Sequence, residues 1–280
     1  MAVRIVTDSA ADITHEEARE LGITIVPMYL RFGEEVYRDG VDIDADEFYH
    51  RLTTSPVHPF TSSPSPGDFA RAYEQVARDT DEIVSIHITS KHSATYNAAI
   101  LGRDIAQERG RRIEVIDSKG VTMWQGLAVL AAARAVEARC NLHEVVERVR
   151  ETIAHMRVLA LLDTLAYIVR GGRLSRPISA VEPLLKVKPM LTLRDGEIRL
   201  AHLVRTRRKG LEQLRTFLAS AQRPEELVVV YSTTPAGAHA LADSIRSLHP
   251  TIVPRIARLG PALGIHGGPG SMFAIVKEAI

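Results

Sequence analysis

Residues 83–96 read Ile-Val-Ser-Ile-His-Ile-Thr-Ser-Lys-His-Ser-Ala-Thr-Tyr, an apolar run followed by a polar turn and then a helical pattern. Ile83–Ile88 is predicted to be a buried strand, and Ser93 is the predicted N-cap of the next helix. The same order recurs after Val3–Val6 and after Ile113–Ile116. Strands that alternate with helices pair in parallel through helical crossovers, so this half is predicted to be an α/β domain with a mainly parallel sheet.

Capping patterns mark the helices between these strands. A Ser, Thr, Asp or Asn side chain at the N-cap accepts a hydrogen bond from a backbone N–H, and an acidic residue three positions later completes the pattern. Ile23–Leu30 is predicted to be one further strand, and a long Ala-rich helix is expected to end near Ala138. The capping pattern predicts helices that begin after Thr14, Asp44, Ser65 and Asn141.

The C-terminal half has a different texture, because Asp195-Gly196 lies between the apolar runs Pro189–Leu193 and Glu197–Val204. An Asp-Gly pair between two such runs is a strong signal for a β-hairpin. Further strands are predicted at Leu227–Tyr231 and Ile252–Ala257, with helices between them. An antiparallel hairpin joined to strand–helix units predicts a mixed sheet.

The end of the chain, after Gly270, is predicted to be a helix. The change of texture near the middle predicts two α/β domains, residues 1–157 and 158–280. The fold class is therefore α/β, with a mainly parallel N-terminal sheet and a mixed C-terminal sheet.

Composition excludes several classes of function. The 280 residues are 45% hydrophobic and carry a formal net charge of +1, so the basic excess of a nucleic-acid-binding protein is absent. The chain has one cysteine, Cys140, which allows neither an intrachain disulfide nor a zinc site of several thiolates. We expect a cytoplasmic protein, because a reducing compartment suits this cysteine usage. The sequence has no apolar run of membrane-spanning length.

Three short polar segments are the candidates for a binding site: 60–66, 89–96 and 266–270. Each is predicted to precede a helix, where unpaired N–H groups and the helix dipole favour an anion. In open α/β sheets ligands bind beyond the carboxyl ends of strands, where such turns lie. The alternative reading is structural, with Ser and Thr as plain N-caps and Gly-Gly-Pro-Gly as a tight turn.

Two basic segments, Arg170–Ser175 and Arg205–Lys209, stand out from the balanced charge. Positive charge at a helix start opposes the helix dipole, which a partner or an anion could offset. The alternative is a solvated helix start for the second segment and a helix C-cap for the first. The acidic cluster from Asp39 to Asp46 is predicted to be a solvated loop, because it lacks the pattern of a calcium loop.

Motifs for other chemistries are absent from the sequence. It has no P-loop, no G-x-G-x-x-G after the first strand, no G-x-S-x-G elbow and no H-E-x-x-H pair. The sequence therefore predicts no metal site, and the polar segments must be interpreted as a set.

In combination and in this order, the motifs resemble those of one family. They are Thr7–Ser9, Tyr37–Ile43, Thr61–Phe69, Ser93–Tyr96, Asp117–Lys119, Arg170–Ser175, Lys186–Pro189, Val204–Arg207 and His266–Gly270. Over essentially its whole length the chain resembles the DegV family of bacterial fatty-acid-binding proteins. That family usually has S-G-T-[YF], T-S-Q-P and H-T-G-P-G, where this chain has Ala94, Ser63 and Gly267.

The resemblance implies two α/β domains with a lipid held between them. The family's carboxylate-binding positions match Thr61, Ser93 and His266, and none of the departures removes a hydroxyl or imidazole from this set. Residues expected to support the carboxylate site are Ser62, Thr95, Gly267 and Gly268.

The implied function is non-enzymatic. The chain would bind a long-chain fatty acid such as palmitate, without a cofactor, and present the carboxylate to a separate fatty acid kinase, which would form an acyl phosphate for phospholipid metabolism. Arg173 and Arg205 are proposed as part of the surface that docks the kinase. Transient contact with a membrane surface is compatible with this carrier role, and no nucleic-acid partner is expected.

Two other functions stay open at this point. A Ser–His acyl hydrolase could use Ser93 and His266, although it would need an acidic residue to orient the imidazole, and none can be assigned. An anion-binding regulatory module would use the same helix starts without a lipid.

Overall fold

The computed structural model describes residues 3–78, 80–107, 111–174 and 187–279. The N-terminal sheet has four parallel strands in the order β2-β1-β6-β7. Its strands are β1 (Arg4–Asp8), β2 (Ile23–Val26), β6 (Glu82–His87) and β7 (Arg112–Asp117). The predicted parallel sheet is confirmed.

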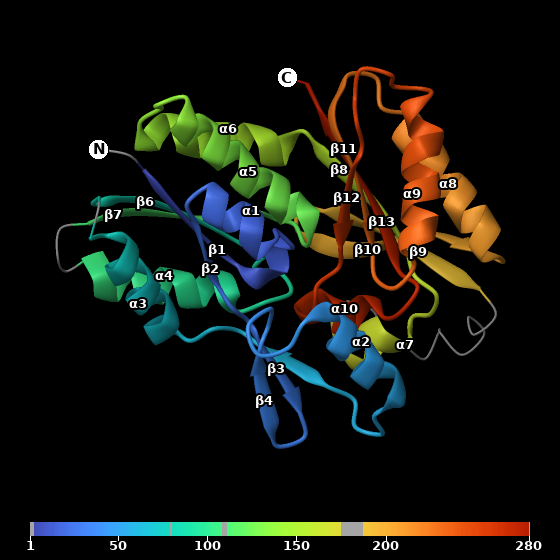
Figure 1. Cartoon of the computed structure of the whole chain (residues 1–280), viewed down its shortest axis with the longest axis horizontal. Helices are drawn as coiled ribbons and strands as arrows, with labels where there is room; N and C mark the ends of the chain where they lie inside the picture. The colour runs from blue at the N-terminus through green and yellow to red at the C-terminus, as the bar shows by residue number, and fades with distance from the viewer. Residues whose placement is uncertain (1–2, 79, 108–110, 175–186, 280) are drawn as a thin grey trace.

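Helices cover both faces of this sheet (Figure 1). On one face lie α3 (Pro66–Val76) and α4 (Thr95–Gln107), and on the other lie α5 (Met123–Glu137) and α6 (Leu142–Ala154). Short segments η1 (Ser9–Ala11) and α1 (His15–Glu20) follow β1. The helices expected after Thr14, Ser65 and Asn141 are confirmed, since each of these side chains accepts a hydrogen bond from the backbone N–H three residues later.

The predicted strand Ile23–Leu30 is wrong as a single element. It divides into β2 and β3 (Tyr29–Phe32), which belong to different sheets, and Pro27 lies between them. Proline cannot donate to a strand ladder, so the chain leaves the first sheet here. β3 pairs antiparallel with β4 (Glu35–Arg38) and β5 (Phe60–Ser62) in a small sheet that the sequence analysis did not predict. The helix expected after Asp44, α2 (Ala45–Thr54), packs beside it.

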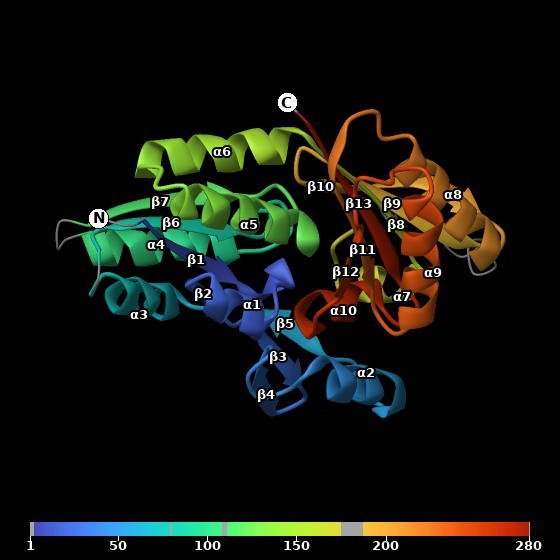
Figure 2. The same cartoon turned by 45° about the horizontal axis from the view of Figure 1, so that its top comes forward.

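The C-terminal sheet has six strands in the order β10-β9-β8-β13-β11-β12 (Figure 2). They are β8 (Met156–Leu161), β9 (Lys188–Arg194), β10 (Glu197–Val204), β11 (Pro224–Tyr231), β12 (Arg255–Arg258) and β13 (Met272–Glu278). The hairpin β9–β10 is confirmed, with Asp195 and Gly196 both at positive φ in its turn. β11 and β12 are parallel while the other pairs are antiparallel, so the sheet is mixed as predicted.

The final helix predicted after Gly270 is wrong, because this segment is β13. β13 lies between β8 and β11 in the middle of the sheet, and almost all of it is buried. A short apolar run with Ile275 and Val276 suits a strand buried on both faces, and its periodicity alone does not separate strand from helix. A short helix, α10 (Pro261–Gly267), comes before it instead.

Helices α8 (Arg207–Ala219) and α9 (Pro235–Arg246) cover the outer face of this sheet, and the short α7 (Ala166–Arg170) follows β8. The inner face of the sheet packs against α5 in the largest hydrophobic core. In this core Leu127 and Val129 of α5 lie with Val228 of β11 and Ile275 of β13. A helix that is buried on nearly all sides belongs inside a core. The predicted division at residues 157 and 158 falls inside β8, whose residues from Met156 onward pair with β13, and it stays a proposal.

Candidate functional site

One cavity lies where the inner face of the C-terminal sheet meets α10, α7, β5 and the loop after β6. It holds about 830 Å³ of empty space, including space open to solvent. Most of its wall is apolar and comes from alternate residues of β8 and β9 and from α10. The apolar lining consists of Met28, Ile88, Val121, Val158, Ala160, Leu162, Ile168, Leu191, Leu193, Ile198, Ala262, Leu263 and Phe273. We call this cavity the tail pocket.

Polar side chains gather on one part of the tail pocket. Thr61 Oγ1 lies 3.4 Å from His266 Nε2, across 205 residues of sequence. Ser93 Oγ lies 3.3 Å from Ser63 Oγ and 2.8 Å from Thr95 Oγ1, so a network of hydroxyls holds its position. Arg173 lines the same region and donates from Nε to the carbonyl of His92. Four segments that are distant in sequence therefore supply hydroxyls, an imidazole and a guanidinium to one place.

His266 occupies the last turn of α10, and its ring packs against Gly171. A Cβ at Gly171 would lie 2.1 Å from His266 Nδ1, so only glycine leaves room for the imidazole. Burial lowers the pKa of His266 to about 3, and the charge of Arg173 adds to this effect. The imidazole is therefore neutral. Nδ1 is buried and has no hydrogen-bond partner within the described residues.

A more polar cleft adjoins the tail pocket at this point and shares Thr61, Ser93 and Arg173 with it. The cleft extends to Lys91 and Gly172. Burial and the charge of Arg173 also lower the pKa of His92, which lines both cavities. His92 and His266 are neutral. Among the described residues that line the tail pocket, Arg173 therefore carries the positive charge, on its guanidinium.

Comparison with known proteins identifies the family. A family model described as "Uncharacterised protein, DegV family" matches residues 2–278. The chain belongs to the DegV family. A DegV domain-containing protein of Caldanaerobacter subterraneus subsp. tengcongensis is 34% identical over 282 residues, which cover 99% of each chain.

Solved DegV structures share the whole fold. A fatty-acid-binding DegV protein from Thermus thermophilus matches with a TM-score of 0.88 and 30% identity, covering all of both chains. DegV from Bacillus subtilis, described as a fatty acid binding protein, matches with a TM-score of 0.91 and 26% identity, covering 99% of this chain and 100% of that one. A stearic-acid-binding protein from Eubacterium ventriosum matches with a TM-score of 0.88 and 28% identity, covering 98% of each chain. These matches confirm the predicted α/β fold class.

The structure of this DegV protein brings the predicted head-group residues together. Thr61, Ser93, His266 and Gly267 all line the tail pocket. Their local settings differ from the prediction of three helix N-termini. Thr61 lies on β5, and His266 lies at the C-terminal end of α10 because Gly268, at positive φ, ends that helix.

The helix start at α4 also differs in detail. Its first turn is closed by the N–H of Ala98 on the carbonyl of Ala94, so Ala94 and not Ser93 stands at the cap. Ser93 instead accepts from the N–H of Thr95. The Ser93 side chain therefore lines the tail pocket and does not cap the helix.

The supporting residues fall into two groups. Thr95 is fully buried and contacts Ser93, so it holds the Ser93 side chain in position without lining the cavity. Ser62 is exposed, and neither it nor Gly268 lines the tail pocket. The Gly268 carbonyl accepts a hydrogen bond from Ser271 and so fixes the turn after α10.

The two arginines proposed for docking have different settings. Arg173 is half-buried and faces the tail pocket, so its first role is inside the site. Arg205 is exposed and lines neither cavity. Its neighbour Arg207 is held by Asp163, at 2.9 Å, and by the carbonyl of Gly270, which offsets the charge at the start of α8. Ser175 and Lys186, the ends of two motifs, lie outside the described residues.

From the sequence, Arg173 was predicted only as a docking residue, and His92 was not singled out, although both line the tail pocket. The Arg-Gly-Gly-Arg motif carried a usable signal, since Gly171 makes room for His266 and Arg173 follows two residues later. The apolar run Val158–Leu162 contributes every second residue to the tail pocket, as expected of a strand face. Ile25–Leu30 contributes only Met28.

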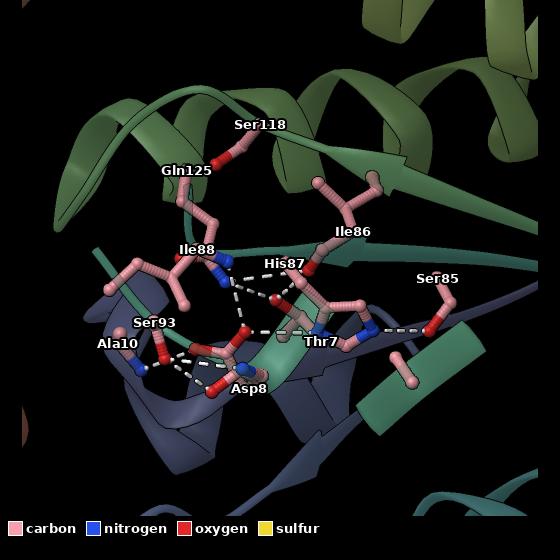
Figure 3. Close-up of polar contacts among 12 residues, drawn as sticks. Thr7, Asp8, Ala10, Ser85, Ile86, His87, Ile88, Ser93, Ser118 and Gln125 are labelled. Atoms are coloured by element: carbon pink, nitrogen blue, oxygen red, sulfur yellow. Dashed lines mark hydrogen bonds and ion pairs between the residues drawn. The ribbon is translucent and has the colours of Figure 1, made fainter. Parts of the chain in front are cut away.

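A second polar network lies inside the N-terminal sheet (Figure 3). The Asp8 carboxylate lies 2.9 Å from His87 Nδ1, and His87 Nε2 lies 2.7 Å from Ser85 Oγ. The order of these groups matches a Ser–His–Asp triad, but all three side chains are fully buried. No substrate can reach Ser85, so the network is structural: Asp8 also accepts from the N–H groups of Ala10 and Ile88 and fixes the turn after β1.

Two other kinds of feature are absent from the described residues. They contain no group of three or more His, Cys, Asp or Glu side chains placed to hold a metal ion. Within the same ranges, no helix combines the length and the apolar character needed to cross a bilayer.

The acidic cluster from Asp39 to Asp46 is only partly a solvated loop, because Asp39 is 3% exposed while Asp42 and Asp46 lie at the surface.

Proposed function

We propose that this DegV protein binds a long-chain fatty acid, with its carboxylate at the polar end of the tail pocket and its hydrocarbon chain along the apolar wall. The observation that carries the proposal is the meeting of Thr61, Ser93, His266 and Arg173 on one apolar cavity. Relatives described as binding fatty acid or stearic acid share the fold over nearly the whole chain.

The head group suits the donors that surround it. Hydrogen bonds from a charged guanidinium to a carboxylate are among the stronger ones in proteins. The Ser93 and Thr61 hydroxyls can donate, and a neutral His266 can donate from one ring nitrogen. Because Arg173 is a single positive charge in a partly buried place, a single carboxylate balances it, and an uncharged head group would leave it unpaired.

The tail supplies most of the affinity. Burying one methylene gives about 0.8 kcal/mol, so a chain of ~15 methylenes gives on the order of 12 kcal/mol before costs. Loss of translational freedom and of chain flexibility removes a large part of this gain. We therefore assign affinity mainly to the apolar wall and orientation to the polar end.

The second part of the proposal is the carrier role. The polar cleft, lined by Lys91, Asn97 and Gly172, supports this role, because a separate kinase would reach the bound carboxylate through it to form an acyl phosphate. In this role the chain is not an enzyme and acts in the cytoplasm. Arg205 remains a proposed docking residue, and its exposure outside the cavity makes it the cleaner of the two arginines to test.

The hydrolase alternative is less well supported by this site. Ser93 is hydrogen-bonded to Ser63 and Thr95, whereas the nearest hydroxyl to His266 Nε2 is that of Thr61. His266 Nδ1 has no carboxylate partner among the described residues. A general base needs an orienting group on that nitrogen and the nucleophile on the other.

Native mass spectrometry of the purified protein tests the ligand. We expect a bound species with the mass of a long-chain fatty acid, or uptake of palmitate or oleate after delipidation. Ser93→Ala and His266→Ala should each weaken binding by roughly 1–3 kcal/mol. A protein that stays lipid-free and takes up neither acid would contradict the proposal, as would steady hydrolysis of acyl esters that Ser93→Ala abolishes. Saturable binding of a short phosphorylated metabolite instead would favour the regulatory module.

The kinase role has its own test. Arg205→Glu should weaken association with the kinase while leaving fatty acid uptake unchanged. Unchanged association would refute the docking role of Arg205 without touching the binding proposal. Arg173→Glu is not suitable as the only variant, since it also changes the tail pocket.

A further inference from the structure

The imidazole of His92 makes a hydrogen bond that fixes the position of its proton. His92 lies in the loop between β6 and α4, directly before Ser93. Its Nε2 lies 2.9 Å from the backbone nitrogen of Ile198 on β10. Because a backbone N–H can only donate, Nε2 is the acceptor, and the neutral ring carries its proton on Nδ1. Burial and then the charge of Arg173 lower the pKa of His92, which keeps the ring neutral.

The N–H that His92 accepts belongs to an edge strand. β10 is the outermost strand on one side of the C-terminal sheet, and an edge strand presents N–H groups that no neighbouring strand accepts. Close by, the Thr89 hydroxyl donates to the carbonyl of Gly196 at 3.0 Å. A Cβ at Gly196 would lie 2.5 Å from that hydroxyl, so the hairpin turn packs directly on the loop. These contacts hold the Nε2 side of the ring against β10.

The other ring nitrogen, Nδ1, has no hydrogen-bond partner among the described residues. It is accessible, in contrast to Nδ1 of His266, which is enclosed. The two nitrogens of an imidazole point in divergent directions, so the N–H at Nδ1 is directed away from β10. His92 lines both the tail pocket and the polar cleft, together with Thr61, Ser93 and Arg173. An accessible donor is therefore left without a partner where the carboxylate is proposed to bind.

The backbone of His92 is tied to two of these head-group residues. The N–H groups of His92 and Ser93 both donate to the carbonyl of Thr89 at 3.3 Å. Arg173 donates from Nε to the carbonyl of His92, also at 3.3 Å. The loop therefore holds the His92 ring at a fixed place relative to the Ser93 hydroxyl and the Arg173 guanidinium.

We propose that His92 is a further head-group residue, which donates a hydrogen bond from Nδ1 to the carboxylate while its Nε2 accepts from β10. This inference rests on the proposed function, because it adds a donor to the same carboxylate site. The two oxygens of a carboxylate accept several hydrogen bonds, so His92 adds to the other donors without displacing them. The alternative is that His92 only fastens the hairpin to the loop.

NMR of the histidine ring nitrogens in delipidated protein tests the tautomer and the contact. We expect a protonated Nδ1 and an unprotonated Nε2 for His92. Saturation with palmitate should shift the Nδ1 resonance, because a hydrogen bond to a carboxylate is stronger than one to water. A proton on Nε2, or an Nδ1 resonance that palmitate leaves in place, would overturn the proposal.

A pair of variants separates the head-group contact from the fastening of the hairpin. In His92→Gln the side-chain carbonyl can still accept from Ile198, but the donor at the position of Nδ1 is lost. Palmitate affinity should fall about 10- to 150-fold, with little change in urea unfolding. Thr89→Val is the matched control, because it removes the bond to Gly196 and keeps every head-group residue. It should lower stability and leave palmitate affinity nearly unchanged.

Unaltered affinity in His92→Gln, or an equal loss of affinity in Thr89→Val, would overturn the role of His92 while leaving fatty acid binding intact. Failure of the unaltered protein to bind palmitate would overturn the proposed function itself.

Discussion

Gly171→Ala is the sharpest test of how the polar end is built, because it moves His266 without removing any polar group. The backbone of Gly171 is compatible with alanine, since its φ is −72°. The added Cβ would lie 2.1 Å from His266 Nδ1, whereas ordinary contact begins near 3.4 Å. The ring must therefore retreat by about 1.3 Å, the difference between these distances. That movement breaks its geometry with Thr61 and with a bound carboxylate.

Loss of one head-group hydrogen bond corresponds to roughly 1–3 kcal/mol, or about 5- to 150-fold in affinity. Overpacking should also lower the free energy of unfolding by about 1–3 kcal/mol. Affinity is measured by calorimetric titration of delipidated protein with palmitate, and stability by urea unfolding.

A double-mutant cycle separates displacement of His266 from general damage. If Gly171→Ala acts through the ring, it should cost almost no affinity when His266 is already alanine. Gly172→Ala is the control: its Cβ meets no atom within 4 Å, but its φ of +68° is unfavourable for alanine. It should lower stability by about 1–2 kcal/mol and leave affinity nearly unchanged. Equal losses in the wild-type and His266→Ala backgrounds, or wild-type affinity in Gly171→Ala, would refute the reasoning.

Three further predictions concern other parts of the molecule. Arg173→Gln should weaken palmitate binding about 10- to 150-fold. It should also raise the pKa of His92, which is lowered first by burial and then by the Arg173 charge. An unchanged titration of His92 by NMR would contradict this. Burial raises the pKa of Asp39 from 3.8 to about 7, so the folded protein holds a proton that the unfolded chain releases, and the free energy of unfolding should fall as pH rises from about 4 to about 7. Asp39→Asn should gain stability relative to wild type over that range, by a few kcal/mol at most, and parallel pH profiles in urea unfolding would exclude the effect. Arg207→Ala loses its contacts with Asp163 and the Gly270 carbonyl, so chemical unfolding should show a loss of roughly 1–3 kcal/mol, and a variant as stable as wild type would show that this linkage is unimportant.

Asp39 shows why burial could not be foreseen from local sequence. It belongs to a run of acidic residues with the character of a surface loop, yet its carboxylate accepts from Ser9 and from the backbone of Ala262 in α10. Asp12 likewise accepts from the N–H of Gly260 and from Thr122. Both carboxylates therefore hold the start of α10, the helix that carries His266. The partners of Asp12 lie 110 positions away at Thr122 and 248 positions away at Gly260.

The sequence by itself determined the elements whose signals are local. At the starts of α1, α2, α3 and α6 the N-cap side chain accepts from the backbone N–H three residues later, and Asp195-Gly196 forms the hairpin turn. These interactions join near neighbours in the chain. Through the family motifs it also identified Thr61, Ser93 and His266 before their positions in space were known.

Only the tertiary structure decided how these elements meet. It turned the last apolar run into the central strand β13 and brought Thr61 to His266 across 205 residues. It also placed Arg173 on the wall of the tail pocket, where its charge adds to the burial that lowers the pKa of His266. Each of these outcomes depends on which surfaces pack together, and packing joins residues whose separation along the chain carries no local pattern.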